Sequence, residues 1–206
     1  MNIKITVKGL ENSTMILANY YGDKQYVKDT LQLDKKGTVV IKQDTTYPGG
    51  VYLAVFPALG NRYFEFIISE SAFTLETDSN DLTGHVKVTG SVENGLFYDD
   101  MKFLSKMKVV SDSISKLFKD AKDQKEKDKF REQLVKLDSD VKAKRNEVMT
   151  KNPTLFYAKL LKAMKELDVP DAPRDAQGKI TDSTFQWRWY KAHYWDNVDL
   201  SDDRLL

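Results

Sequence analysis

The chain has 206 residues, which is long enough for one large domain or two small ones with buried cores. Hydrophobic residues make up 41% and charged residues 31%, a composition that excludes a disordered tail and is typical of a folded, well-solvated protein. Lys and Arg number 32 against 31 Asp and Glu, so the net charge of +1 predicts no general attraction to nucleic acid or to an anionic membrane.

Targeting and redox signals are absent from these residues. No stretch approaches the roughly 20 apolar residues that a membrane-spanning helix needs, and the first residues alternate like a strand rather than forming an apolar signal core. If the natural protein is exported, we expect its signal to have been removed. The sequence contains no cysteine, which excludes disulfides, thiolate metal sites and a cysteine nucleophile within it but does not decide the cellular compartment.

The first part of the chain reads as β-structure. Short runs rich in Val, Ile, Thr, Tyr and Phe recur at close spacing with turn residues between them, and residues 34–37 (Asp-Lys-Lys-Gly) suit a hairpin turn. About eight strands are predicted, at 3–7, 14–21, 26–33, 38–41, 51–56, 63–68, 73–77 and 85–88. This number and spacing favour an antiparallel sandwich or open barrel over a fold of alternating strands and helices.

The pattern becomes helical after Gly90. Proline and glycine disappear for more than fifty residues after Leu96, and two apolar stripes with helical spacing follow, out of phase by two residues. No apolar residue lies between Lys122 and Lys129, so we expect an antiparallel helical hairpin rather than one continuous rod. The fold class is therefore α+β, with a β-domain at 1–90 and a helical region at 91–206 that we expect to continue beyond Leu206.

The remaining chain is predicted to hold two shorter helices. Asn152 followed by Pro153 suits a helix start, and an irregular link spans residues 167–178. Residues 182–184 (Asp-Ser-Thr) can cap a helix within FQWRWYKAHYWDN, residues 185–197, which contains all three tryptophans of the chain.

This aromatic segment has two nearly opposed apolar sides. At about 100° per residue, Trp187, Tyr190 and Tyr194 share one side, while Phe185, Trp189 and Ala192 share the other, and Trp195 lies between them. Two such stripes imply burial on both sides, so our first interpretation is that these residues belong to a core. We expect chain that follows Leu206 to cover the second stripe. The alternatives are a surface that binds a glycan or protein and a platform for single-stranded nucleic acid. The candidate interface residues are Trp187, Trp189, Tyr190, Tyr194 and Trp195.

Catalytic and metal-binding patterns are weak. The two histidines, His85 and His193, have no spacing typical of zinc ligands, and His193 is expected to pack or cap rather than to act as a base. No Gly-x-Ser-x-Gly elbow marks a nucleophile, and the glycines do not form a phosphate loop. We therefore predict no catalytic residue, no cofactor and no metal.

Several segments resemble a known family. GGVYLAVFP, RYFEFIISES, NPTLFYAKLLKAM and above all GSVENGLFYDD and YKAHYWDN look like the N-terminal region of bacterial envelope proteins of the thioredoxin-like TlpA/AhpC-TSA type. In that family a β-rich domain of unknown function and a helical region precede a thioredoxin fold that exchanges thiols and disulfides. The resemblance implies export to the periplasm or outer membrane, often as a lipoprotein.

The decisive family motif is missing from this sequence. Thiol–disulfide exchange needs Cys-x-x-Cys, and without cysteine no family catalytic residue can be placed here. Either the sequence ends before the redox domain or it comes from a relative without one, and the unpaired aromatic stripe favours the former.

Three functions follow from these observations. The first is a non-catalytic accessory module whose partner is a thioredoxin-like domain of the same chain or an envelope protein. The second is a free-standing envelope protein whose β-sandwich recognises a glycan or protein, which exposed aromatic residues on the sandwich would favour. The third is an enzyme built from scattered carboxylates such as Asp78, Asp81, Glu93 and Asp99, which would need a cleft that raises the pKa of two of them.

Overall fold

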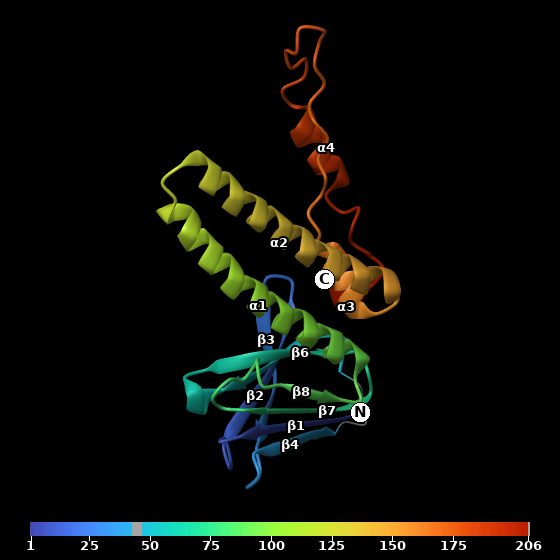
Figure 1. Ribbon diagram of the computed structural model, residues 1–206. Coiled ribbons are helices and arrows are strands. Elements are labelled where there is room, and N and C mark those ends of the chain that lie inside the picture. Colours follow the sequence, from blue (N-terminus) through green and yellow to red (C-terminus); the bar gives the residue numbers. More distant parts are fainter. Residues whose placement is uncertain (43–46, 206) are drawn as a thin grey trace.

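The computed structural model describes residues 1–42 and 47–205 and shows a β-sandwich joined to a helical region (Figure 1). The strands are β1 (Asn2–Lys8), β2 (Thr14–Tyr21), β3 (Lys24–Gln32), β4 (Thr38–Lys42), β5 (Gly50–Phe56), β6 (Arg62–Ile68), β7 (Ala72–Asp78) and β8 (Lys87–Thr89). The helices are α1 (Val92–Asp120), α2 (Gln124–Lys151), α3 (Phe156–Ala163) and α4 (Phe185–His193), with 3-10 turns η1 (Pro57–Leu59) and η2 (Asp203–Leu205). The predicted α+β class is confirmed.

The strands form two four-stranded sheets. The first sheet has the order β4-β1-β7-β8 and the second has the order β3-β2-β5-β6. Successive side chains along each strand point alternately to the inner and the outer face of its sheet. Ile3, Ile5 and Val7 of β1 are therefore fully buried between the sheets, while Lys4 is exposed. The sandwich is the predicted architecture rather than the open barrel.

One strand pair departs from the expected antiparallel arrangement. β1 runs parallel to β7, in the register Asn2↔Ala72 to Lys8↔Asp78, whereas the other paired strands are antiparallel. The alternation of side chains is the same in both kinds of pair, so it cannot tell strand direction. The parallel pair brings the first strand of the sandwich next to its seventh strand.

The predicted turn between β3 and β4 is confirmed. The Asp34 carboxylate accepts hydrogen bonds from the backbone N–H groups of Lys36 and Thr38 at 2.8 and 2.9 Å. Gly37 has φ +68°, and a Cβ there would lie 2.3 Å from the Val7 carbonyl oxygen, so the turn requires glycine.

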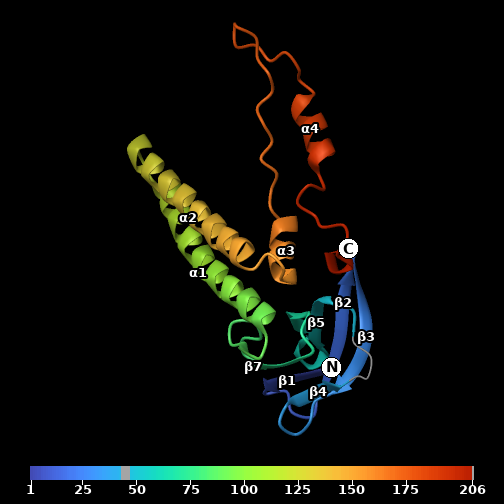
Figure 2. The same cartoon turned by 90° about the vertical axis from the view of Figure 1, so that its right-hand side faces the viewer.

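The predicted helical hairpin is also confirmed, with α1 and α2 antiparallel and a link at residues 121–123 (Figure 2). Asp123 caps α2 by accepting a hydrogen bond from the Glu126 backbone N–H at 2.8 Å. Ile114 and Phe118 on α1 and Leu134 on α2 are only half-buried, because no other helix of the described residues covers the outer part of the hairpin.

The predicted start of α3 was wrong. Asn152 lies at the C-terminal end of α2, where its backbone N–H donates to the Val148 carbonyl oxygen at 3.0 Å, and α3 begins at Phe156. The residue before α3, Leu155, offers no capping side chain, and the cap comes instead from Glu93, 63 residues away. A local sequence signal could not reveal this cap.

Buried polar contacts join the sandwich to the helices. β6 is the edge of the second sheet, and the fully buried Asn94 side chain bonds both the backbone N–H and the carbonyl of Ile67, at 2.8 Å each. The Tyr98 hydroxyl donates to the Glu65 carbonyl oxygen at 2.5 Å. One hydrophobic core continues from the sandwich to α3. The predicted boundary at residue 90 is the point where strands give way to helices. The division into two domains there stays a prediction.

The helices of the described ranges do not include one that is both long enough and apolar enough to cross a membrane.

Candidate interaction surface

Residues 165–198 form an arm that leaves α3, extends away from the sandwich and returns to it. Both views show the arm beyond the body, with a first limb at residues 165–173 and α4 in the returning limb (Figures 1 and 2). The limbs are tied at the root by a hydrogen bond from Asn197 Nδ2 to the Lys165 carbonyl oxygen at 3.1 Å, and further out by one from Gln186 Nε2 to the Pro170 carbonyl oxygen at 3.3 Å.

Helix α4 begins with help from Asp182, within the predicted capping segment. Its carboxylate accepts hydrogen bonds from the backbone N–H and the hydroxyl of Thr184, at 3.0 and 2.9 Å, and also pairs with Arg188. The contact with the Thr184 hydroxyl is the main reason that the pKa of Asp182 is lowered. A negative charge at this end of the helix is favourable, since it lies at the positive end of the helix dipole.

No residue of α4 is buried, so the interpretation of its aromatic residues as core was wrong. The exposed fractions are 63% for Trp187, 44% for Tyr190, 49% for Tyr194 and 56% for Trp195. Trp187, Tyr190 and Tyr194 lie on one side of the segment, and Trp195, which follows the helix, packs its ring against Tyr194. We call these four side chains, with Lys191 beside Trp187, the aromatic face.

Trp189 is the one predicted interface residue outside the aromatic face. It is half-buried on the opposite side of α4, with Phe185, and its ring stacks on His193 at a centroid distance of 4.2 Å. The Nδ1 atom of His193 lies 2.6 Å from Asp196 Oδ2. His193 therefore packs against Trp189 and pairs with Asp196, as expected.

The rings of the aromatic face meet edge to face. The interplanar angle is 71° between Tyr190 and Tyr194 and 89° between Tyr194 and Trp195, and the Lys191 ammonium lies 4.7 Å from the centroid of the Trp187 ring. The face is therefore ridged and carries a cation, rather than being a flat platform of coplanar rings.

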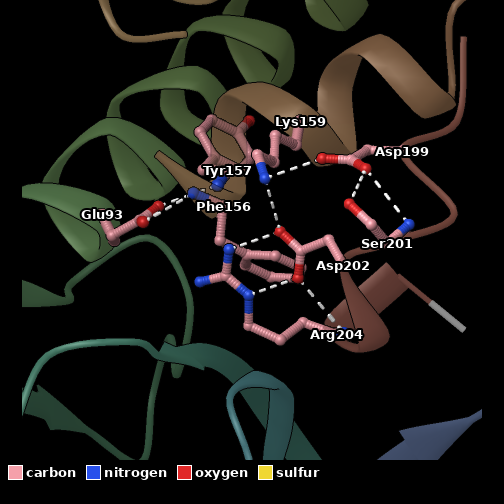
Figure 3. Close-up of polar contacts among 8 residues, drawn as sticks. All are labelled: Glu93, Phe156, Tyr157, Lys159, Asp199, Ser201, Asp202 and Arg204. Carbon is pink, nitrogen blue, oxygen red and sulfur yellow. Dashed lines mark hydrogen bonds and ion pairs between the residues drawn. The ribbon is translucent and has the colours of Figure 1, made fainter. Parts of the chain in front are cut away.

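The returning end of the arm is fastened to α3 by a cluster that we call the latch: Lys159, Asp199, Asp202 and Arg204 (Figure 3). Lys159 Nζ lies 2.9 Å from both Asp199 Oδ2 and Asp202 Oδ2. Arg204 bonds both oxygens of Asp202, at 2.6 and 2.5 Å, and its guanidinium lies 5.0 Å from the centroid of the Phe156 ring.

Charge pairing in the latch shifts its titrations. The hydrogen bonds from Arg204 are the largest cause of the strongly lowered pKa of Asp202, and Asp199, then Asp202, raises the pKa of Lys159. At neutral pH the latch is thus fully charged. Beside it, the buried Glu93 carboxylate accepts the backbone N–H groups of Phe156 and Tyr157, at 2.8 Å each (Figure 3).

The sequence analysis missed the latch. Lys159 is separated from the other three members by 40 or more residues, so no local pattern links it to them. The arm is therefore held at both ends, because the first limb is continuous with α3 and the latch bonds the returning end to α3.

The four scattered carboxylates are not brought into one site. Asp78 Oδ2 lies 2.7 Å from His85 Nδ1, a contact that is the largest cause of its lowered pKa, and Asp81 accepts backbone N–H groups in the same loop. Asp99 is exposed on α1, while Glu93 is enclosed beneath α3. Among the described residues, no three His, Asp or Glu side chains are grouped as metal ligands would be.

The fold and this surface define a β-sandwich domain with a helical extension that presents an aromatic arm. Residues 1–97 match the profile of a family described as a domain of unknown function, DUF4369. The match spans the sandwich and the first residues of α1, which is slightly less than half of the chain. No curated protein matches the sequence.

Proposed function

We propose that this chain is a non-catalytic accessory module of a thioredoxin-like thiol–disulfide oxidoreductase of the bacterial envelope, in the periplasm or at the outer membrane. Its aromatic face is the surface that holds a thioredoxin-like domain, either of the same polypeptide or of an envelope protein. The observation that carries this proposal is the exposure of Trp187, Tyr190, Tyr194 and Trp195 on an arm fixed at both ends.

The physical argument concerns the cost of binding. Large aromatic side chains dominate the energetics of protein interfaces, and an element that is already ordered loses less entropy when it binds. The latch and the Asn197 to Lys165 bond supply that order. Four aromatic residues left half-exposed on an ordered arm are thus suited to binding rather than to stabilising this chain alone.

Two further observations support the redox context. The DUF4369 match lies where the resemblance to the thioredoxin-like family places a β-rich domain of unknown function. The described sequence contains no cysteine, so a thiol–disulfide reaction would have to take place on another domain.

The first test reads the natural coding frame beyond Leu206. A strand followed by Cys-x-x-Cys supports a partner in the same polypeptide. A stop codon directly after Leu206 removes that partner and leaves a separate envelope protein.

The second test measures binding by calorimetry between this chain and the thioredoxin-like domain so identified. Trp187→Ala combined with Trp195→Ala should weaken binding by at least about tenfold, because each removes a central aromatic contact. Tyr21→Ser, an exposed aromatic site on the sandwich, is the matched control. Equal binding by both variants would contradict the proposed surface.

A second candidate function has its own supporting observation. The sandwich also exposes large apolar side chains, namely Tyr21, Tyr26, Val27 and Tyr63, and the rings of Tyr21 and Tyr26 lie edge to face at 6.4 Å. Exposed aromatic residues on the sandwich favour a free-standing envelope protein that recognises a glycan or a protein through this domain. Titration of the labelled chain with envelope oligosaccharides, followed by NMR, tests it: shifts confined to β2, β3 and β6 would support recognition by the sandwich, and their absence would exclude these glycans.

A further inference from the structure

A groove lies at the root of the arm, between α2 and α3, with a volume of about 450 Å³. Its floor is apolar and consists of Val141 and Met149 from α2, Leu161 from α3, and Met164, the residue directly after α3. Met164 is 64% exposed, which is unusual for a large apolar side chain at the end of a helix that packs on a core. The groove is therefore an uncovered apolar surface with a defined shape.

The rim of the groove carries a small excess of negative charge. Glu166 and Asp168, from the first limb, form no ion pair within the described ranges. The pKa of Lys142 is raised mainly by Asp138, with which it pairs at 2.8 Å, and further by the charges of these two carboxylates. Arg145 pairs with the buried Asp100 at 3.2 Å, and Lys165 is the one rim cation without an ion pair in the described ranges.

The aromatic face has matching chemistry. Lys191 lies beside Trp187 and is paired with no carboxylate among residues 1–42 and 47–205, whereas Arg188 is already paired with Asp182. Aromatic rings pack favourably against methionine sulfur, so Trp187 and Tyr190 suit a floor that contains Met149 and Met164. The Lys191 ammonium would then meet the carboxylates of Glu166 and Asp168.

The arm cannot fill the groove of its own chain in this conformation. In Figure 2 the first limb lies between α2 and α4, and Gln186 and Asn197 tie α4 to that limb. The side chains of the aromatic face are exposed, so they are not seated in that groove.

We propose that two copies of this chain pair reciprocally, with the aromatic face of each α4 seated in the groove between α2 and α3 of the other. Such a dimer is closed by a two-fold axis, so each copy contributes both a helix and a groove. The inference goes beyond the proposed function and needs no thioredoxin-like partner.

The available area is sufficient for a stable dimer. Burial of one aromatic side chain covers about 150–250 Å², so four half-exposed ones offer on the order of 400 Å² per copy. Reciprocal contact, with the groove surface included, then removes on the order of 1,200 Å² from water, which is at the lower end of the range for specific interfaces. A dimer of this kind covers the aromatic face, so a thioredoxin-like domain and a second copy exclude each other.

The test is sedimentation equilibrium of the 206-residue chain. We expect a reversible dimer, with a dissociation constant raised at least about tenfold by Lys191→Glu, because like charges then face each other. Glu166→Lys with Asp168→Lys should have a similar effect. Combining all three substitutions should restore the constant to within about threefold of the wild-type value, since the charges are exchanged rather than removed.

Two variants make the result specific. Met164→Glu places a charge on the floor and should abolish dimerisation, while Lys129→Glu, at the far end of the hairpin, should leave it unchanged. All these positions are exposed, so the fold is expected to persist, and circular dichroism verifies it.

A chain that stays monomeric up to about 100 μM overturns the proposal, since an interface of this size should associate below that concentration. So does a dimer that Glu166→Lys with Asp168→Lys leaves unaffected, or a triple variant as weak as Lys191→Glu alone. Each outcome is independent of binding to a thioredoxin-like domain, so failure here leaves the proposed function standing.

Discussion

Replacement of Glu93 gives the sharpest test of how the helical region is fixed to the sandwich. This side chain is 3% exposed, and its two carboxylate oxygens accept the backbone N–H groups of Phe156 and Tyr157 at 2.8 Å each. These N–H groups open helix α3 and have no partner within the helix itself. Glu93→Ala therefore leaves two donors without an acceptor in the core.

The expected loss can be worked from these two contacts. A hydrogen bond to a charged group contributes about 1.5–3 kcal/mol, so loss of both should lower the free energy of unfolding by about 3–6 kcal/mol. Glu93→Gln keeps one oxygen acceptor but turns an amide NH₂ group toward the other N–H, so we expect a loss of roughly 2 kcal/mol.

Urea denaturation followed by circular dichroism measures these differences, and hydrogen exchange at the amides of Phe156 and Tyr157 locates them. Glu76→Gln, on the exposed outer face of the first sheet, is the matched control and should change stability by less than about 0.5 kcal/mol. If Glu93→Ala stays within about 0.5 kcal/mol of the wild type and the two amides exchange no faster, Glu93 is not the cap of α3 and the reasoning fails.

Asn94→Ala should lower the free energy of unfolding by about 2–5 kcal/mol, because it leaves the buried N–H and carbonyl of Ile67 unpaired, and urea denaturation measures this loss. The same change exposes the edge of β6 and should increase aggregation, which light scattering measures. Acid should loosen the latch in part. Hydrogen bonds from Ser201 and then Lys159 lower the pKa of Asp199 to about 2, below its unfolded value of about 3.9, so its stabilisation is present above about pH 4 and is lost as the pH falls through about 2, while Asp202, whose pKa is lowered further, still holds Lys159 and Arg204. Nitrogen relaxation of arm residues across this range should show increasing motion, and unchanged relaxation would contradict the role of the latch. All three tryptophans lie on the arm, so acrylamide should quench most of the fluorescence of the monomeric native chain; strong protection would mean that the aromatic face is covered.

The sequence predicted the strands well because the signal for a strand is local. The expected run 14–21 is β2 in the structure, and 51–56 and 63–68 differ from β5 and β6 by one residue at their starts. Alternation of apolar and polar side chains shows which face of a strand is buried, but it does not show which strands lie next to it. The parallel pairing of β1 with β7 therefore could not be predicted, because it joins segments about 70 residues apart.

The candidate surface was only partly predictable. Helical spacing correctly placed Trp187, Tyr190 and Tyr194 on one side and Trp189 on the other, yet the same spacing led to the wrong expectation that these residues are core. Spacing gives directions around a helix axis, whereas burial depends on what lies beside the helix. The contact between Lys159 and Asp202 depends on the folded path of the arm and has no local signal.

Helix α1 begins inside the joint and continues without interruption to the end of the hairpin. Its 29 residues correspond to a rod of about 44 Å, since each residue advances a helix by 1.5 Å. Asn94 and Tyr98 clamp one end of this rod to β6, so the position of the opposite end is set by a count of residues rather than by a flexible linker. Insertion of a single residue in its middle would move the hairpin tip outward by about 1.5 Å and turn it by about 100°. The length of α1 therefore sets both the distance of the tip from the sandwich and the direction in which the tip faces.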